Sequence, residues 1–316
     1  MGDVLLFSQY LSKINDFETR TECTWLPKLE GQRLYMQQII GNSSKIKILQ
    51  HFGSHEMTSG LGAYCFYNAR DSPGIENYIN YHEKKFLCNT DLKINDLFIP
   101  NSFDLYGKKY ENDTQVVTPI MYRFGYIAHV IKENLIKDER KVILEIGAGW
   151  GGLPFLINRL INCCYIIIDI PSTIMLSLFF LWKNNKRVYF DINLNNLTKD
   201  ITDNYDFVFI LPTHIDIIPD NFVDLVVNTD SFPEMDKYCI ELYLKMSSRI
   251  IKNKGFFYDY NCNCSNFLFL KEKKKEYLKP FEEIINKIAP ISAYIPACKG
   301  LNDTETEYYE NLYQKN

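Results

Sequence analysis

A carboxylate followed closely by three glycines is the stretch of this sequence best suited to chemistry. Glu145 lies near the end of an apolar run, and Gly147, Gly149 and Gly151 follow it at alternate positions. Glycines permit a tight turn and leave no side chain between the backbone and a ligand. The residues after them read as the start of a helix, whose free amides favour a carboxylate or a phosphate. The pattern predicts a strand, a turn and a helix, with Ala148 inside a ligand-binding turn.

A second acid stands in a comparable position. Asp169 ends the next apolar run, 24 residues after Glu145, and Ile170 follows it. Ligands of open parallel sheets bind beyond the carboxyl ends of the strands, so both acids are expected at one edge of a sheet. The carboxylate of Asp169 can accept hydrogen bonds from both hydroxyls of a ribose. An aspartate that caps a helix or lies on the surface is the alternative.

The glycine run resembles the S-adenosylmethionine (SAM) site of class I methyltransferases. Gly147, Gly149 and Gly152 also satisfy the dinucleotide pattern G-x-G-x-x-G, and a glycine turn that binds nothing is a third interpretation. Glu145 favours SAM, because a carboxylate tolerates a sulfonium and an ammonium group but repels a pyrophosphate. More than 140 residues precede the motif, whereas a dinucleotide fold usually opens with it.

Three stretches together are similar to the sugar O-methyltransferase family of bacterial glycan clusters. They are 145–152 (EIGAGWGG), 168–171 (IDIP) and 224–235 (DLVVNTDSFPEM), and the similarity covers about 95–265. The resemblance implies a Rossmann-like class I methyltransferase sheet with helices on both faces and SAM as cofactor. It implies glycan biosynthesis, with methyl transfer to a hydroxyl of a nucleotide sugar or glycan precursor.

A sugar hydroxyl is a poor nucleophile, so a general base must take its proton. Glu234 is the first candidate, because it belongs to the third of these stretches and lies beyond a strand end. His214 is the second, since it follows another strand and titrates near neutrality, and Asp230 is the third. The alternative for Glu234 is a carboxylate that stabilises a first helical turn, and for His214 a structural histidine.

Further contacts with SAM follow from the same comparison. Asn228 and Thr229 are expected to line the methionine part or the reacting methyl group, and Arg123 to pair with the SAM carboxylate or lie on the surface. No resident metal is predicted, because His51 and His55 stand four apart without a third ligand. A Mg²⁺ held by Asp230 and Glu234 stays open.

Other functions stay open as well. A methyltransferase for another small hydroxyl or amine fits the same residues, as does a non-catalytic subunit with the same fold. An NAD-dependent epimerase or reductase fits less well, because Tyr238 and Tyr243 have no lysine four residues on.

The net charge and the cysteine content of the chain limit the classes of partner that are expected. The 316 residues carry a net charge of −4, so neither nucleic acid nor an anionic membrane is expected as the main partner. Nine cysteines without a C-x-x-C pair argue against a zinc ribbon and fit a reduced, cytoplasmic setting. No signal peptide is recognised, and charged residues interrupt the apolar stretch 155–182. The expected partners are SAM, S-adenosylhomocysteine and a small acceptor, with homo-oligomerisation left open.

Alternating strand and helix patterns begin near residue 119 and predict a parallel α/β sheet. The expected domains are a mainly helical cap and acceptor-binding region at 1–115, a SAM-binding domain at 116–300, and a flexible tail at 301–316. Predicted helices are 120–135, 172–183 and 235–251, and predicted strands are 141–146, 165–169, 207–211, 223–228 and 255–260. A further strand at 187–190 leaves undecided whether it or 207–211 lies beside 165–169.

Overall fold

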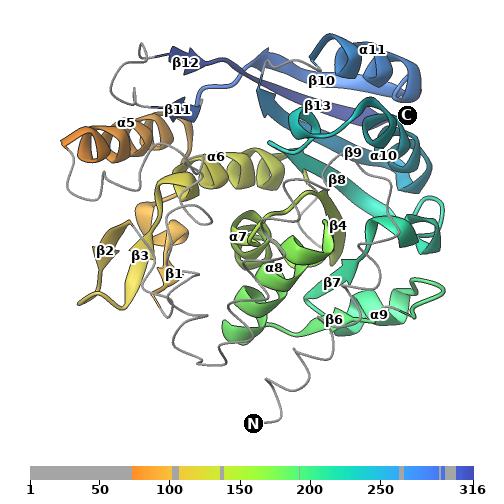
Figure 1. Ribbon diagram of the computed structural model, residues 1–316, viewed down its shortest axis with the longest axis horizontal. Coiled ribbons are helices and arrows are strands. Elements are labelled where there is room, and N and C mark those ends of the chain that lie inside the picture. The colour runs from red at the N-terminus through yellow and green to blue at the C-terminus, as the bar shows by residue number, and fades with distance from the viewer. Residues whose placement is uncertain are drawn as a thin grey trace.

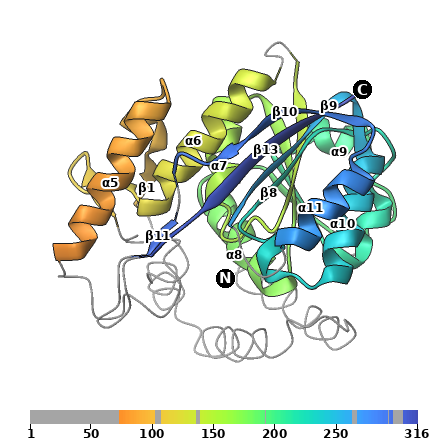
Figure 2. The same ribbon diagram turned by 90° about the horizontal axis from the view of Figure 1, so that it is seen from above.

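The computed structural model describes residues 73–101, 107–135, 139–191, 193–262, 267–291, 293–295 and 304–316. An eight-stranded sheet forms the centre of this part of the chain, and helices cover both of its faces (Figures 1 and 2). The strands are, in spatial order, β10 (Phe281–Ile288), β13 (Tyr308–Lys315), β9 (Ile251–Cys262), β8 (Val223–Thr229), β4 (Lys141–Ile146), β5 (Cys163–Ile168), β7 (Phe207–Ile210) and β6 (Val188–Phe190). The predicted Rossmann-like α/β class is confirmed.

Side chains of successive strand residues point to opposite faces, and the sheet therefore has two cores. Ile143 of β4 packs on the side of α6 (Pro119–Asn134), α7 (Gly152–Leu160) and α8 (Pro171–Lys183). Leu144, the next residue, packs on the side of α9 (Lys199–Asn204), α10 (Lys237–Ile250) and α11 (Phe267–Tyr277). Because both faces are covered, the central strands are continuous apolar runs in the sequence.

The undecided strand order has a clear answer. β7 pairs in parallel with β5, with Tyr165 opposite Phe207, and β6 forms the outer edge beyond β7. All neighbouring pairs of the sheet are parallel except those of β13, which runs antiparallel to both β9 and β10.

Elements that precede the sheet pack beside α6. They are α5 (Pro73–Asn89), the 3₁₀ turn η1 (Ile94–Leu97) and a small antiparallel sheet of β1 (Ile99–Pro100), β3 (Gln115–Val117) and β2 (Lys108–Tyr110). Gly125 of α6 permits this approach, because a Cβ there would lie 2.4 Å from Leu97 and 2.6 Å from Phe86. The region predicted as a helical cap thus contains a short sheet. Its first 72 residues, with His51 and His55, lie outside the described residues.

Four shorter elements complete the described fold. They are η2 (Pro212–Ile217), η3 (Phe232–Glu234) and the two-stranded pair of β11 (Ala293–Ile295) with β12 (Thr304–Thr306). Among the residues described here, no helix combines the length and apolar character needed to cross a membrane.

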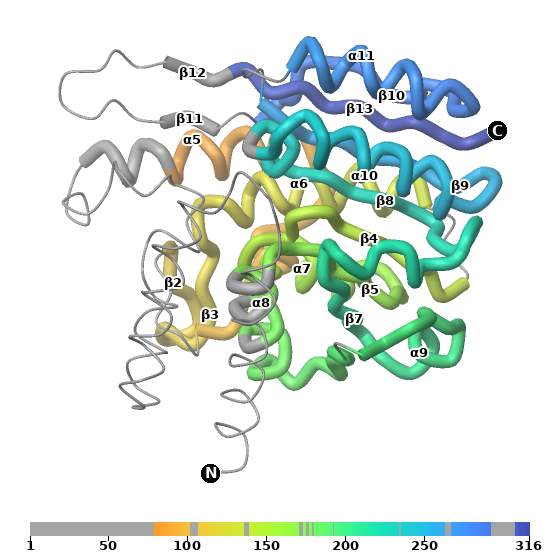
Figure 3. Tube along the Cα trace, turned by 45° about the vertical axis from the view of Figure 1, so that its right-hand side comes forward, coloured from red at the N-terminus to blue at the C-terminus, as the bar shows by residue number. Residues whose placement is uncertain are grey.

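The expected flexible tail at 301–316 is wrong from Tyr308 onward. These residues form β13, which lies between β9 and β10 in the sheet; Figure 3 shows it in dark blue. Glu310 of β13 is fully buried, where Tyr126 and Tyr258 donate hydrogen bonds to it at 2.7 and 3.0 Å and Lys287 lies at 3.4 Å. A polar segment is therefore stable inside the sheet because distant partners satisfy its buried carboxylate.

The role of β13 can be measured through its apolar anchor. Leu312 is 2% exposed, and Leu312→Ala is expected to lower the free energy of unfolding by about 2–5 kcal/mol in a urea titration. Ile288→Ala on the neighbouring β10 is the control, because Ile288 is largely exposed and its removal should cost about 0.5 kcal/mol or less. Equal stabilities of the two variants would contradict the burial of β13.

Candidate functional site

The glycine turn after β4 has the left-handed backbone that glycine permits, as expected of the tight turn predicted from the sequence. Gly147, Gly149 and Gly151 have φ angles of +78°, +58° and +89°, which residues with a side chain rarely adopt. A Cβ at Gly147 would lie 2.4 Å from Ser231, whereas a Cβ at Gly149 would meet nothing within 4 Å. The turn closes through a bond from the Gly151 amide to the Ala148 carbonyl, and α7 begins directly after it. Gly149 is thus the point where a ligand has room beside bare backbone.

Asp169 lies at the carboxyl end of β5 and is bound to this turn. Its Oδ2 accepts a hydrogen bond from the Gly149 amide at 2.8 Å, and its Oδ1 accepts one from the Ile170 amide at 2.7 Å. Two backbone amides therefore hold the carboxylate in a fixed orientation beside the glycine turn. The position fits the predicted contact with a ribose, and that contact stays a prediction.

Glu145 lies in the same region but beneath the surface. It is 1% exposed, and its oxygens accept hydrogen bonds from Tyr165 at 3.0 Å and Thr229 at 3.1 Å. Glu145 pairs in register with Ile167 of β5 and Val227 of β8, so both hydroxyl donors lie two residues away on the same face. Tyr165 was not among the residues predicted for the site, although the alternation of strand residues places it on the face of Glu145.

Burial raises the pKa of Glu145 to about 8, because desolvation of the charged form outweighs the two hydrogen bonds that favour it. The negative charges of Asp169 and Asp230 raise the pKa further. At neutral pH, Glu145 therefore carries a proton for most of the time. A cation brought near it would favour the charged form and release that proton.

This raised pKa predicts how stability depends on pH. From about pH 5 to about pH 8 the folded protein holds a proton on Glu145 that the unfolded chain has lost, so stability falls as pH rises, by about 1.4 kcal/mol per pH unit. Glu145→Gln cannot ionise and is expected to remove this contribution. The measurement is urea unfolding of both proteins across this pH range. Parallel stability curves for wild type and variant would contradict the raised pKa.

Asp230 and Arg123 form an ion pair at the end of β8. Asp230 has a left-handed backbone with φ +58°, and its amide donates to the Tyr260 carbonyl at 3.1 Å. Arg123 is buried in α6, donates to a carboxylate oxygen of Asp230 and lies 5.1 Å from the ring centre of Tyr308. Arg123 was expected to pair with the SAM carboxylate or lie on the surface. It is buried rather than on the surface, and it pairs with an acid 107 positions away. Its contact with the SAM carboxylate stays a prediction.

Asn228 supports the sheet edge and has no polar group left for a ligand. Its amide nitrogen donates to the Ile146 carbonyl at 2.9 Å and to the Ser231 hydroxyl. Its oxygen accepts from the Phe232 amide at 3.3 Å and from Asn261 at 2.8 Å. These bonds use both donors and both acceptor positions of the side chain, which is fully buried. These bonds give the Asn228 side chain a structural role at the sheet edge, and its predicted contact with the cofactor stays a prediction.

The structure separates the three candidate bases into two groups. Asp230 and Glu234 both follow β8, the latter at the end of η3, whereas His214 lies in η2 after β7. Two strands, β5 and β4, lie between β7 and β8, so their ends are about 14 Å apart at a strand spacing of about 4.8 Å. His214 lies 3.0 Å from the hydroxyl of Thr213. The two groups therefore follow strand ends on opposite sides of β4 and β5.

No family model and no curated protein matches the chain. Several solved structures resemble it in the fold of the backbone. One is a provisionally named sarcosine dimethylglycine methyltransferase of Galdieria sulphuraria, with 10% identity, a TM-score of 0.45, and coverage of 76% of this chain and 98% of the other.

Two further structures resemble the chain to a similar degree. A precorrin-6y C5,15-methyltransferase of Geobacter metallireducens has 15% identity and a TM-score of 0.40, and the match covers 60% of this chain and 89% of the other. A SAM-dependent methyltransferase of Methanosarcina mazei has 15% identity and a TM-score of 0.40, and the match covers 59% of this chain and 96% of the other. Similarity at this level says nothing about the molecule that this chain binds.

Proposed function

We propose that the protein is a SAM-dependent methyltransferase. The observation that carries the proposal is the place of two acids beside the glycine turn. Asp169 accepts a hydrogen bond from the Gly149 amide, and buried Glu145 is the second-last residue of the strand that leads into the turn. The chain leaves β4 towards β5 and later returns to β8 on the other side of β4. Ligands of open α/β sheets bind where the strand order reverses in this way.

The electrostatics of Glu145 favour a cationic ligand over a dinucleotide. A pyrophosphate near Glu145 would raise its pKa further and gain no attraction, because a carboxyl group, protonated or charged, offers an anion no positive charge. The sulfonium and ammonium groups of SAM would instead stabilise the charged carboxylate, through its position beside Thr229 and the glycine turn. In this arrangement Asp169 would bind the ribose hydroxyls.

The acceptor we propose is a hydroxyl group of a sugar, in a nucleotide sugar or a glycan precursor. The support is the resemblance over 224–235, which covers most of β8 and the segment after it with Asp230 and Glu234. SAM supplies the methyl group when bound. The residues of this chain would hold the acceptor oxygen in line with it, and a carboxylate after β8 would take the hydroxyl proton while the carbon–sulfur bond breaks.

The proposal is tested in two steps with the full chain. Calorimetry with S-adenosylhomocysteine, SAM and NAD is expected to show binding of the two adenosyl ligands and none of NAD. NAD binding without adenosyl binding would refute the proposal. Incubation with isotopically labelled SAM and a panel of nucleotide sugars, followed by mass spectrometry, then tests the acceptor. Binding of SAM with methyl transfer only to amines or to non-sugar hydroxyls would correct the acceptor class.

A further inference from the structure

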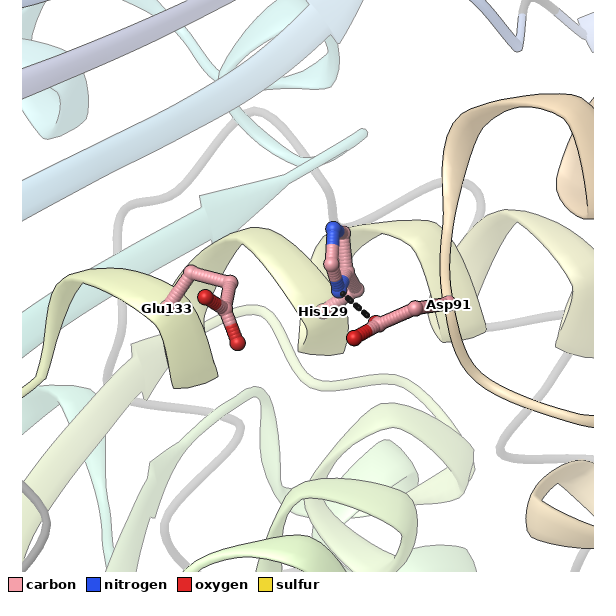
Figure 4. A group of neighbouring side chains, drawn as sticks. All are labelled: Asp91, His129 and Glu133. Carbon is pink, nitrogen blue, oxygen red and sulfur yellow. Dashed lines mark ion pairs between the residues drawn. The ribbon is translucent and has the colours of Figure 1, made fainter.

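Three side chains of types that can bind a metal ion lie close together outside the site described above. Asp91 follows the end of α5, and His129 and Glu133 stand four residues apart on α6 (Figure 4). One donor atom from each of them lies within 4.8 Å of the other two. Residues four apart share one face of a helix, so His129 and Glu133 face the same neighbour, the segment after α5.

The contact between His129 and Asp91 is not an ordinary hydrogen bond. Nδ1 of His129 lies 2.9 Å from Oδ1 of Asp91, yet this nitrogen is buried from solvent and makes no hydrogen bond. The distance is short, but the direction does not suit an N–H donor. A buried imidazole nitrogen that makes no hydrogen bond and lies close to carboxylate oxygens is suited to coordinate a metal ion.

We propose that Asp91, His129 and Glu133 bind a divalent transition-metal ion. One imidazole and two carboxylates suit ions such as Zn²⁺ and Co²⁺, and water would complete the coordination. Donors around one such ion lie at most about 4.2 Å apart, because each bond is about 2.1 Å long. The side chain of Asp91 is 78% exposed and that of Glu133 is exposed, so small rotations of their carboxylates bring the three donors into range.

Such an ion would link the segment after α5 to α6 and stabilise their contact. His129 lies six residues beyond Arg123 on the same helix, about 9 Å along its axis. The ion would therefore bind the C-terminal half of α6, while Arg123 in the N-terminal half pairs with Asp230 at the sheet edge. Its binding does not depend on the proposed methyltransferase activity, and either proposal can fail alone.

The test is a titration of the full chain, stripped of metal by a chelator, with Co²⁺. We expect saturation at one ion per chain, visible absorption without the near-ultraviolet band of a thiolate ligand, and a raised melting temperature. Asp91→Asn, His129→Gln and Glu133→Gln are each expected to weaken binding by about tenfold or more. The control is Asp216→Asn, an exposed acid in η2, which removes the same charge and should bind as wild type does.

Three results would overturn the proposal. They are the absence of saturable Co²⁺ binding, unchanged affinity in Glu133→Gln, and a thiolate band, which would place the ion on cysteines. The exposed carboxylate variants are not expected to disturb folding, so a change in their metal affinity reports on the site itself.

Discussion

Asp169→Ala is expected to weaken S-adenosylhomocysteine binding by about 100-fold or more. The carboxylate would lose two charge-assisted hydrogen bonds to the ribose, each worth about 1.5–3 kcal/mol, and 1.4 kcal/mol corresponds to tenfold in affinity. The substitution also removes the acceptor of the Gly149 amide, so the glycine turn loses its bond to the end of β5. Isothermal titration calorimetry of both proteins measures the difference directly.

A matched aspartate separates this effect from a general loss of charge. Asp191 follows β6 at the outer edge of the sheet, and its carboxylate accepts a hydrogen bond from the Asn193 amide at 2.9 Å. Asp191→Ala removes the same side chain after a strand that the proposed ligand does not reach. The affinity of this variant for S-adenosylhomocysteine should therefore equal that of wild type. Equal affinities of both variants for S-adenosylhomocysteine would refute the role of Asp169.

The sequence was sufficient wherever local patterns determine local structure. The strand 141–146 has the predicted bounds, and the helix predicted at 120–135 begins and ends within one residue of α6. The glycine turn was predictable because only glycine adopts three left-handed conformations within five residues at low cost.

Features that depend on distant pairing were not predictable. Glu310 looks like a surface residue in the sequence, and only Tyr126 and Tyr258, at separations of 184 and 52 residues, explain its burial in β13. Arg123 has an acidic partner that no spacing rule connects to it. The raised pKa of Glu145 likewise results from burial in the folded protein, which composition and periodicity do not reveal.

The segment after β8 shows how a motif can combine support and chemistry. Ser231 packs against Gly147 and donates a hydrogen bond to the Ile146 carbonyl at 2.8 Å, so it fixes the turn that the adenosyl ligand would meet. Asn228 uses all its polar groups for the same purpose. The acids of the segment, Asp230 and Glu234, are therefore its candidates for proton transfer, and they lie on a support that is fixed to β4.

Glu234→Gln is expected to lower turnover by about 100- to 10,000-fold while S-adenosylhomocysteine affinity stays unchanged, because a general base contributes to the chemical step and the amide cannot accept the proton. The measurement is methyl transfer at saturating SAM and acceptor, with binding followed by calorimetry. Glu272→Gln, on the exposed side of α11, is the matched control and should be fully active. Full activity of Glu234→Gln together with loss of activity in His214→Gln would move the base to the end of β7, about 14 Å across the sheet, and would require the acceptor to bind on the side of β5.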